Sequence, residues 1–127
     1  MKKIKLALLC AASLLTTNAF SITNHEFSLG SSVQYELPPN DPQIFSNIFF
    51  WSIKAVCSVV SEGPESVLFV TMLHKNGVFN DNKLPEGSSM SIVVQPHDKF
   101  FITAVSGAKV ELVNQGNQTL LANCSTA

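Results

Sequence analysis

Short runs of alternating apolar residues, separated by clusters of turn-forming residues, constrain the fold of this 127-residue chain more than any other feature. Alternation places every second side chain on one face of a strand, so a run can bury one face and expose the other. The clearest runs occupy residues 33–37, 67–74, 90–95, 100–105, 108–112 and 120–124. Six to eight short strands without a convincing helix predict an all-β fold, a single small β-sandwich.

The most apolar segment, Ile44–Val60, is expected to form one long strand. Period-two spacing with β-branched and aromatic residues favours this interpretation, with a bulge near Ser52 as an option and a helix as the alternative. A charged residue, Lys54, lies in the middle of the segment and disfavours a membrane span.

Two turn signals organise the rest of the chain. Asn76–Gly77 follows the run at 67–74, and Asn-Gly is the strongest short hairpin signal because both residues tolerate positive φ. Residues 78–79 are therefore expected to begin the return strand of a hairpin. Pro38–Pro42 is expected to be a connector, because proline lacks the donor that a sheet requires.

Cys57 and Cys124 form an even pair, which in an oxidising compartment predicts a disulfide that closes the domain. It would close a loop of about 68 residues, for which the chain-entropy model gives roughly 4 kcal/mol before native strain lowers it. Two buried free thiols are the alternative. The spacing of Cys57 and Cys124 suggests an immunoglobulin domain. However, Trp51 precedes Cys57, whereas the immunoglobulin tryptophan follows the first cysteine, and Ala122 stands where a tyrosine would be expected. The sandwich is thus immunoglobulin-like in architecture only.

Residues 1–21 have the order of a secretory signal peptide, in which a cationic start precedes a short apolar run and small residues. The apolar run, Leu6–Leu15, is about half the roughly 20 residues that a membrane helix needs, so no permanent membrane anchor is expected. Small side chains at Ala19 and Ser21 favour cleavage after Ser21, with a cut after Ala19 as the second choice. The protein is therefore expected in the periplasm or outside the cell.

Removal of this segment leaves five lysines against nine acidic residues, a formal net charge of −4, with no arginine. Nucleic acids and anionic membrane surfaces bind cationic patches, so both are disfavoured as partners. The remaining chain divides into residues 22–43, an N-terminal arm or short strand with a Pro-rich connector, and residues 44–127, the β-sandwich domain.

Motifs that specify catalytic geometry are absent from the sequence. The side chains best suited to a metal are His74, His97, Asp98 and Asp81, but none shows the short ligand spacing of a zinc motif. No Gly-x-Ser-x-Gly elbow is present. We therefore expect a non-enzymatic protein without a cofactor. A small secreted hydrolase or metal-dependent enzyme is the alternative, and a structural component of the cell envelope is a third interpretation.

Apolar residues on both sides of the expected strands give the clearest indication of function. Phe49, Phe50 and Trp51 cannot all face one core, because successive strand residues point in opposite directions. The second face could be covered by residues 22–42, enclosed in a barrel, or exposed for a partner. The third explanation predicts a binding module with an interaction patch centred on Phe50 and Met72. Its partner would be a protein, a small molecule or a second copy of the chain.

Overall fold

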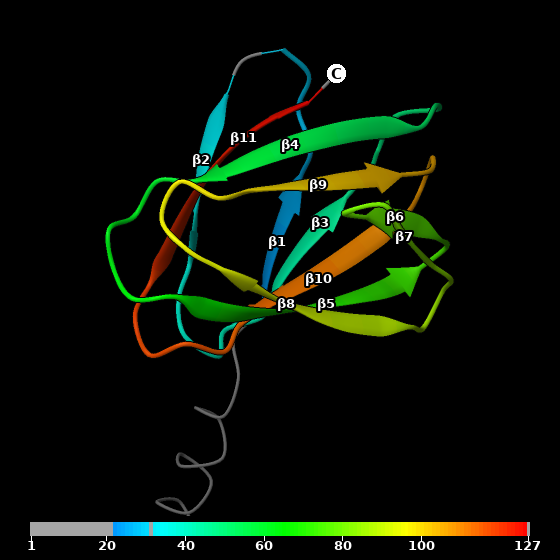
Figure 1. Cartoon of the computed structure of the whole chain (residues 1–127). Helices are drawn as coiled ribbons and strands as arrows, with labels where there is room; N and C mark the ends of the chain where they lie inside the picture. The colour runs from blue at the N-terminus through cyan, green and yellow to red at the C-terminus, as the bar shows by residue number, and fades with distance from the viewer. Residues whose placement is uncertain (1–21, 31, 127) are drawn as a thin grey trace, which may run out of the picture.

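The computed structural model describes residues 22–30 and 32–126 (Figure 1). The expected signal peptide, residues 1–21, lies outside the described residues. Among the residues that the structure describes, no helix is long and apolar enough to cross a membrane.

The described residues form two packed sheets, which confirms the predicted all-β sandwich. Their eleven strands are β1 (Thr23–Glu26), β2 (Val33–Leu37), β3 (Gln43–Ser46), β4 (Ile53–Val59), β5 (Ser66–His74), β6 (Gly77–Phe79), β7 (Asn82–Leu84), β8 (Ser89–Val94), β9 (Lys99–Ala104), β10 (Lys109–Asn114) and β11 (Leu120–Thr126). One sheet has the order β1-β3-β10-β5-β8 and the other β2-β11-β4-β9-β6-β7. Figure 1 shows β4 and β9 in one layer above β5, β8 and β10 in the other.

The core lies between the sheets, on the faces that the alternation indicates. All four inward residues of β4 are at most 2% exposed; they are Ile53, Ala55, Cys57 and Val59. On β10 and β11, the buried apolar residues are Val110, Leu112, Leu120, Ala122 and Cys124. Fully burying a large aliphatic or aromatic side chain contributes about 1.5–3 kcal/mol, so this inner layer drives the association of the sheets.

The expected single strand over Ile44–Val60 is wrong. β3 ends at Ser46 in one sheet and β4 begins at Ile53 in the other, so residues 47–52 connect the two sheets. The break begins at Asn47, whose side-chain Oδ1 accepts a hydrogen bond from the Phe49 amide at 2.8 Å. Such a local bond is the usual means by which asparagine turns the backbone. The alternation is real on both sides of the break, but it belongs to two strands.

The hairpin expected at Asn76–Gly77 is also wrong, because β5 and β6 lie in different sheets. Gly77 is already paired with Leu84 and Ala104, and the chain crosses between the sheets just before it. The hairpin closes one strand later, between β6 and β7. Asn80 and Asp81 form its two-residue turn with φ of 48° and 68°, the backbone that this kind of turn requires.

Residues 22–43, expected as an arm or short strand, contribute β1 to one sheet and β2 to the other. Phe27, Tyr35 and Leu37 from this segment are buried in the core. The segment therefore builds the sandwich and does not cover an outer face. Eleven strands form where six to eight were expected. The additional strands come from residues 22–43, from the short β6 and β7, and from the split of residues 44–60 into two strands.

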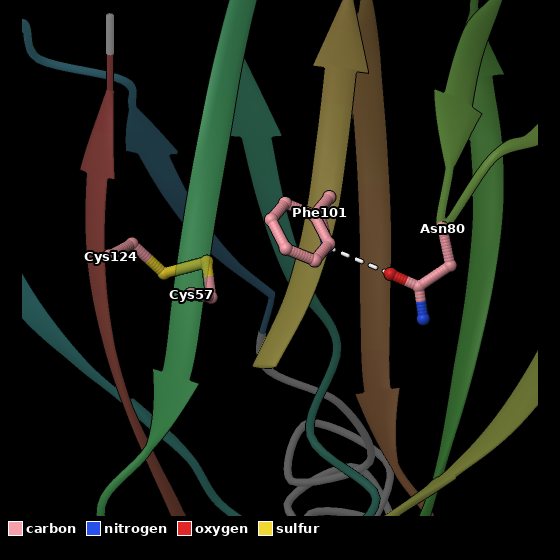
Figure 2. Close-up of a disulfide and its surroundings, with 4 residues drawn as sticks. All are labelled: Cys57, Asn80, Phe101 and Cys124. Carbon is pink, nitrogen blue, oxygen red and sulfur yellow. Dashed lines mark hydrogen bonds between the residues drawn. A yellow bond between two sulfur atoms is a disulfide. The ribbon is translucent and has the colours of Figure 1, made fainter. Parts of the chain in front are cut away.

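The predicted disulfide between Cys57 and Cys124 is present, and it joins directly opposed residues of β4 and β11 within one sheet. An immunoglobulin disulfide instead bridges the two sheets, so the likeness is limited to the architecture. Figure 2 shows this bond and, farther across the same sheet, Asn80 beside Phe101. Asn80 Oδ1 accepts a hydrogen bond from the Phe101 amide at 2.8 Å, which ties the β6–β7 turn to β9.

Candidate functional site

The connection between β3 and β4, residues 47–52, contains Phe50, the most exposed large apolar side chain of the described residues; we call this connection the aromatic loop. Phe50 is 93% exposed, and its neighbours Ile48 and Trp51 are 54% and 52% exposed. These side chains come from positions 48, 50 and 51 of one short loop. They therefore form one apolar projection at an end of the sandwich.

Asn47 holds this loop from inside the protein. Its side chain is buried, and its Nδ2 donates to the carbonyl oxygens of Trp51 at 2.9 Å, Ala104 at 3.0 Å and Val105 at 3.1 Å. Its backbone amide donates to Ala108 O at 2.9 Å. Because buried polar groups need partners, these bonds fix the shape of the loop as part of the folded domain.

A second set of contacts holds the middle of the loop. Ser106 Oγ donates to the Phe49 carbonyl oxygen at 2.6 Å. Phe49 is half-buried and packs against the core, and its ring centroid lies 5.2 Å from that of Trp51. Phe49 thus turns inward while Phe50 points into solvent.

Lys75 lies at the base of the aromatic loop, and Lys54 lies near its end in the sequence. Lys75 Nζ donates to Ser106 O at 3.0 Å, and Lys109 follows Ala108, the residue that accepts from Asn47. Lys54 lies one residue into β4 and is exposed. One acid is close by, since Glu86 accepts a hydrogen bond from the Lys75 amide at 2.7 Å.

A groove of about 420 Å³ opens on the same end of the sandwich, lined by residues 76–78 and 83–85 with Thr103 and Val105. Val105 belongs to both features, because its carbonyl oxygen accepts from Asn47 at 3.1 Å. The exposed residues of the aromatic loop do not line the groove. Phe50, which is 93% exposed, therefore lies in solvent outside this groove.

Met72 does not share a surface with Phe50, because it is 2% exposed and lies in the core. It points inward from β5 with Leu68 and Val70, as the parity of the strand requires. The expected patch of Phe50 and Met72 is therefore wrong in its second member. The outward residues of β5 include Val67, 38% exposed, which lies opposite the exposed Val93 of β8.

The candidate metal ligands have local partners and are not brought together. His74 Nδ1 lies 4.0 Å from Glu86, and His97 Nε2 lies 3.5 Å from Glu62. Asp98 accepts a hydrogen bond from the Gln95 amide and closes its own turn, and Asp81 lies in the β6–β7 turn. Over residues 22–30 and 32–126, no group of three or more His, Cys, Asp or Glu side chains is placed to hold a metal ion.

Comparison of the chain with protein-family models, curated proteins and solved structures gives no match in any of the three. The sequence predicted that Phe50 is exposed, but it did not predict that Asn47 and Ser106 hold the loop. A usable signal was an asparagine followed by four successive apolar residues, since a strand of a sandwich cannot bury such a run on one face.

Proposed function

We propose that this protein is an exported, non-enzymatic interaction module that binds its partner through the aromatic loop. The observation that carries the proposal is the exposure of Ile48, Phe50 and Trp51 on a backbone held by hydrogen bonds from the buried Asn47 side chain. Apolar residues that cluster on a surface mark interaction sites. A loop that is already ordered also avoids much of the entropic cost of binding.

The chemistry of the loop supports binding over catalysis. Its exposed side chains are hydrocarbon and indole groups, whereas acid–base and nucleophilic catalysis need positioned titratable or nucleophilic groups. The candidate ligands His74, His97, Asp98 and Asp81 lie outside the loop. A metal-dependent or hydrolytic role would therefore have to use a different part of the molecule.

Export is supported by the order of residues 1–21 and by the disulfide, since disulfides persist in oxidising compartments. Intact-mass measurement of protein made in an exporting host tests this part. The expected mass begins at Ile22 and is lower by two hydrogens than that of the dithiol. A product that retains residues 1–21, or both thiols, would contradict export.

Site-specific photo-cross-linking tests the binding role. A photoreactive phenylalanine analogue replaces Phe50 in one variant and Asn117, which is exposed in the turn after β10, in the control. In the producing cells, light should generate adducts at position 50 and not at position 117. Equal adduct yields at the two positions would show that the aromatic loop is not the contact site.

A further inference from the structure

We propose that the partner of the aromatic loop is the surface of a zwitterionic phospholipid membrane, into which Phe50 and its neighbours insert. This inference depends on the proposed function, because it takes the aromatic loop as the contact site. It names the chemistry of the partner and the depth to which the protein enters it.

The shape of the loop favours a lipid surface. The Phe50 side chain is 93% exposed, so it extends from the loop almost without contact to the protein, and the nearby groove is lined by other residues. A protein partner would need a pocket complementary to this tip, whereas the fluid acyl region of a bilayer accommodates an apolar projection of any shape. Because Asn47 and Ser106 hold the backbone, the tip keeps its form as it enters.

The residue types follow the depth profile of a membrane interface. Phe50 at the tip would reach the acyl boundary, and Trp51 would lie at headgroup level, where tryptophan is enriched. Lys75 at the base would face lipid phosphates, which cationic side chains contact in interfacial proteins. The aromatic loop itself contains no acidic residue, and Glu86 lies at its base beside Lys75.

The overall charge selects the kind of lipid. Residues 22–127 carry a formal net charge of −4, so an anionic surface would repel the molecule at a distance. Insertion of apolar side chains into a zwitterionic surface requires no long-range attraction. Binding should therefore change little between low and physiological salt, in contrast to binding that depends on cationic patches.

Trp51 is the only tryptophan of the chain, so its fluorescence reports on the loop directly. The protein purified from an exporting host is titrated with phosphatidylcholine vesicles, with and without brominated acyl chains. We expect the emission of Trp51 to shift to shorter wavelengths and to be quenched by the brominated lipid. Phe50→Ser should lower the vesicle partition constant roughly tenfold or more.

Val93→Ser is the matched control, because Val93 is 54% exposed on β8, away from the aromatic loop. It should bind vesicles as the wild type does. Equal losses in Phe50→Ser and Val93→Ser, or unchanged Trp51 emission in the presence of vesicles, would overturn the lipid proposal. So would a lipid-free dimer in sedimentation that Phe50→Ser dissociates.

The cross-linking experiment separates failure of this inference from failure of the proposed function. Lipid adducts at position 50 support both. Protein adducts at position 50 without lipid adducts overturn the lipid inference and leave the interaction module standing. No adducts above the level of position 117 would overturn both.

Discussion

Two buried asparagines lie near opposite ends of β10, and each holds a loop. Asn47 lies beside the first residues of the strand and holds the aromatic loop. Asn114, the last residue of the strand, is fully buried; its Nδ2 donates to Leu37 O at 2.8 Å and Gln118 O at 2.7 Å. Its Oδ1 accepts from the Gly116 amide at 2.9 Å.

The two loops differ in what they display. The turn after Asn114 exposes neutral polar residues, which water satisfies; they are Gln115, Asn117, Gln118 and Thr119. The aromatic loop exposes Ile48, Phe50 and Trp51, which water does not favour. A buried asparagine is therefore a means of holding loops in this fold. Only the residues that a loop displays distinguish a candidate binding site from a structural turn.

Removing either buried asparagine should cause the largest loss of unfolding free energy, and the loss should be similar for the two residues. Asn47→Ala and Asn114→Ala each leave buried backbone groups without partners, at about 1–3 kcal/mol per group. We expect each variant to lose about 3 kcal/mol or more of unfolding free energy in urea titrations, since each asparagine serves several groups. A loss below about 1 kcal/mol for Asn47→Ala would show that the aromatic loop is held by other contacts.

Removing one serine hydrogen bond at each end should have similar effects on stability but different effects on the aromatic loop. Ser106→Ala removes the hydrogen bond to Phe49 O, and Ser61→Ala removes the bond that Ser61 Oγ accepts from the Leu121 amide at 3.1 Å. Each should cost about 1 kcal/mol. Only Ser106→Ala should increase the quenching of Trp51 by acrylamide, because only this bond lies at the aromatic loop. Increased quenching in Ser61→Ala would mean that the two ends are coupled through the sandwich.

The sequence predicted the strands on which buried apolar residues alternate with charged or polar ones. On β10 and β11 the alternation identified the buried residues correctly, because a one-residue shift would bury charge or expose the core. It could not assign strands to sheets. Ile44–Val60 alternates on both sides of the break at Asn47, and period two carries no information about which sheet a strand joins.

Alternation also failed to assign one residue of the candidate site to the correct face of its strand. Phe50 was identified from its surplus of apolar neighbours, but Met72 was assigned to the wrong face of β5, because that strand is apolar on both faces. The Asn76–Gly77 signal failed for a different reason. Its backbone crosses between sheets with positive φ at Lys75, while the turn chemistry expected there occurs at Asn80 and Asp81.

Ionisation of Tyr35, which lies outside both loops, tests whether a change elsewhere in the sandwich reaches the aromatic loop. Burial raises the pKa of Tyr35, the single tyrosine, which lies in β2 against Phe45. Because the neutral phenol is favoured in the folded state, its contribution to stability is complete below the unfolded value of 10.0. That contribution is lost as pH rises through the raised folded pKa. Absorbance titration of the folded protein should give a midpoint above 10.0, with acrylamide quenching of Trp51 unchanged until unfolding begins.

Replacing an exposed residue in each loop should have the smallest effect on stability, and it tests whether the aromatic loop is needed for folding. Phe50→Ser and Asn117→Ser replace exposed residues at opposite ends, and both should leave the unfolding free energy within about 0.5 kcal/mol of wild type. A phenylalanine that is 93% exposed has little buried area to lose. Loss of about 2 kcal/mol or more in Phe50→Ser would mean that its ring packs on the protein and that the two ends differ in folding. If neither variant changes the unfolding free energy, the fold does not require an aromatic ring at position 50. The aromatic loop and the turn after Asn114 then differ in the partners that they can contact and not in their role in folding.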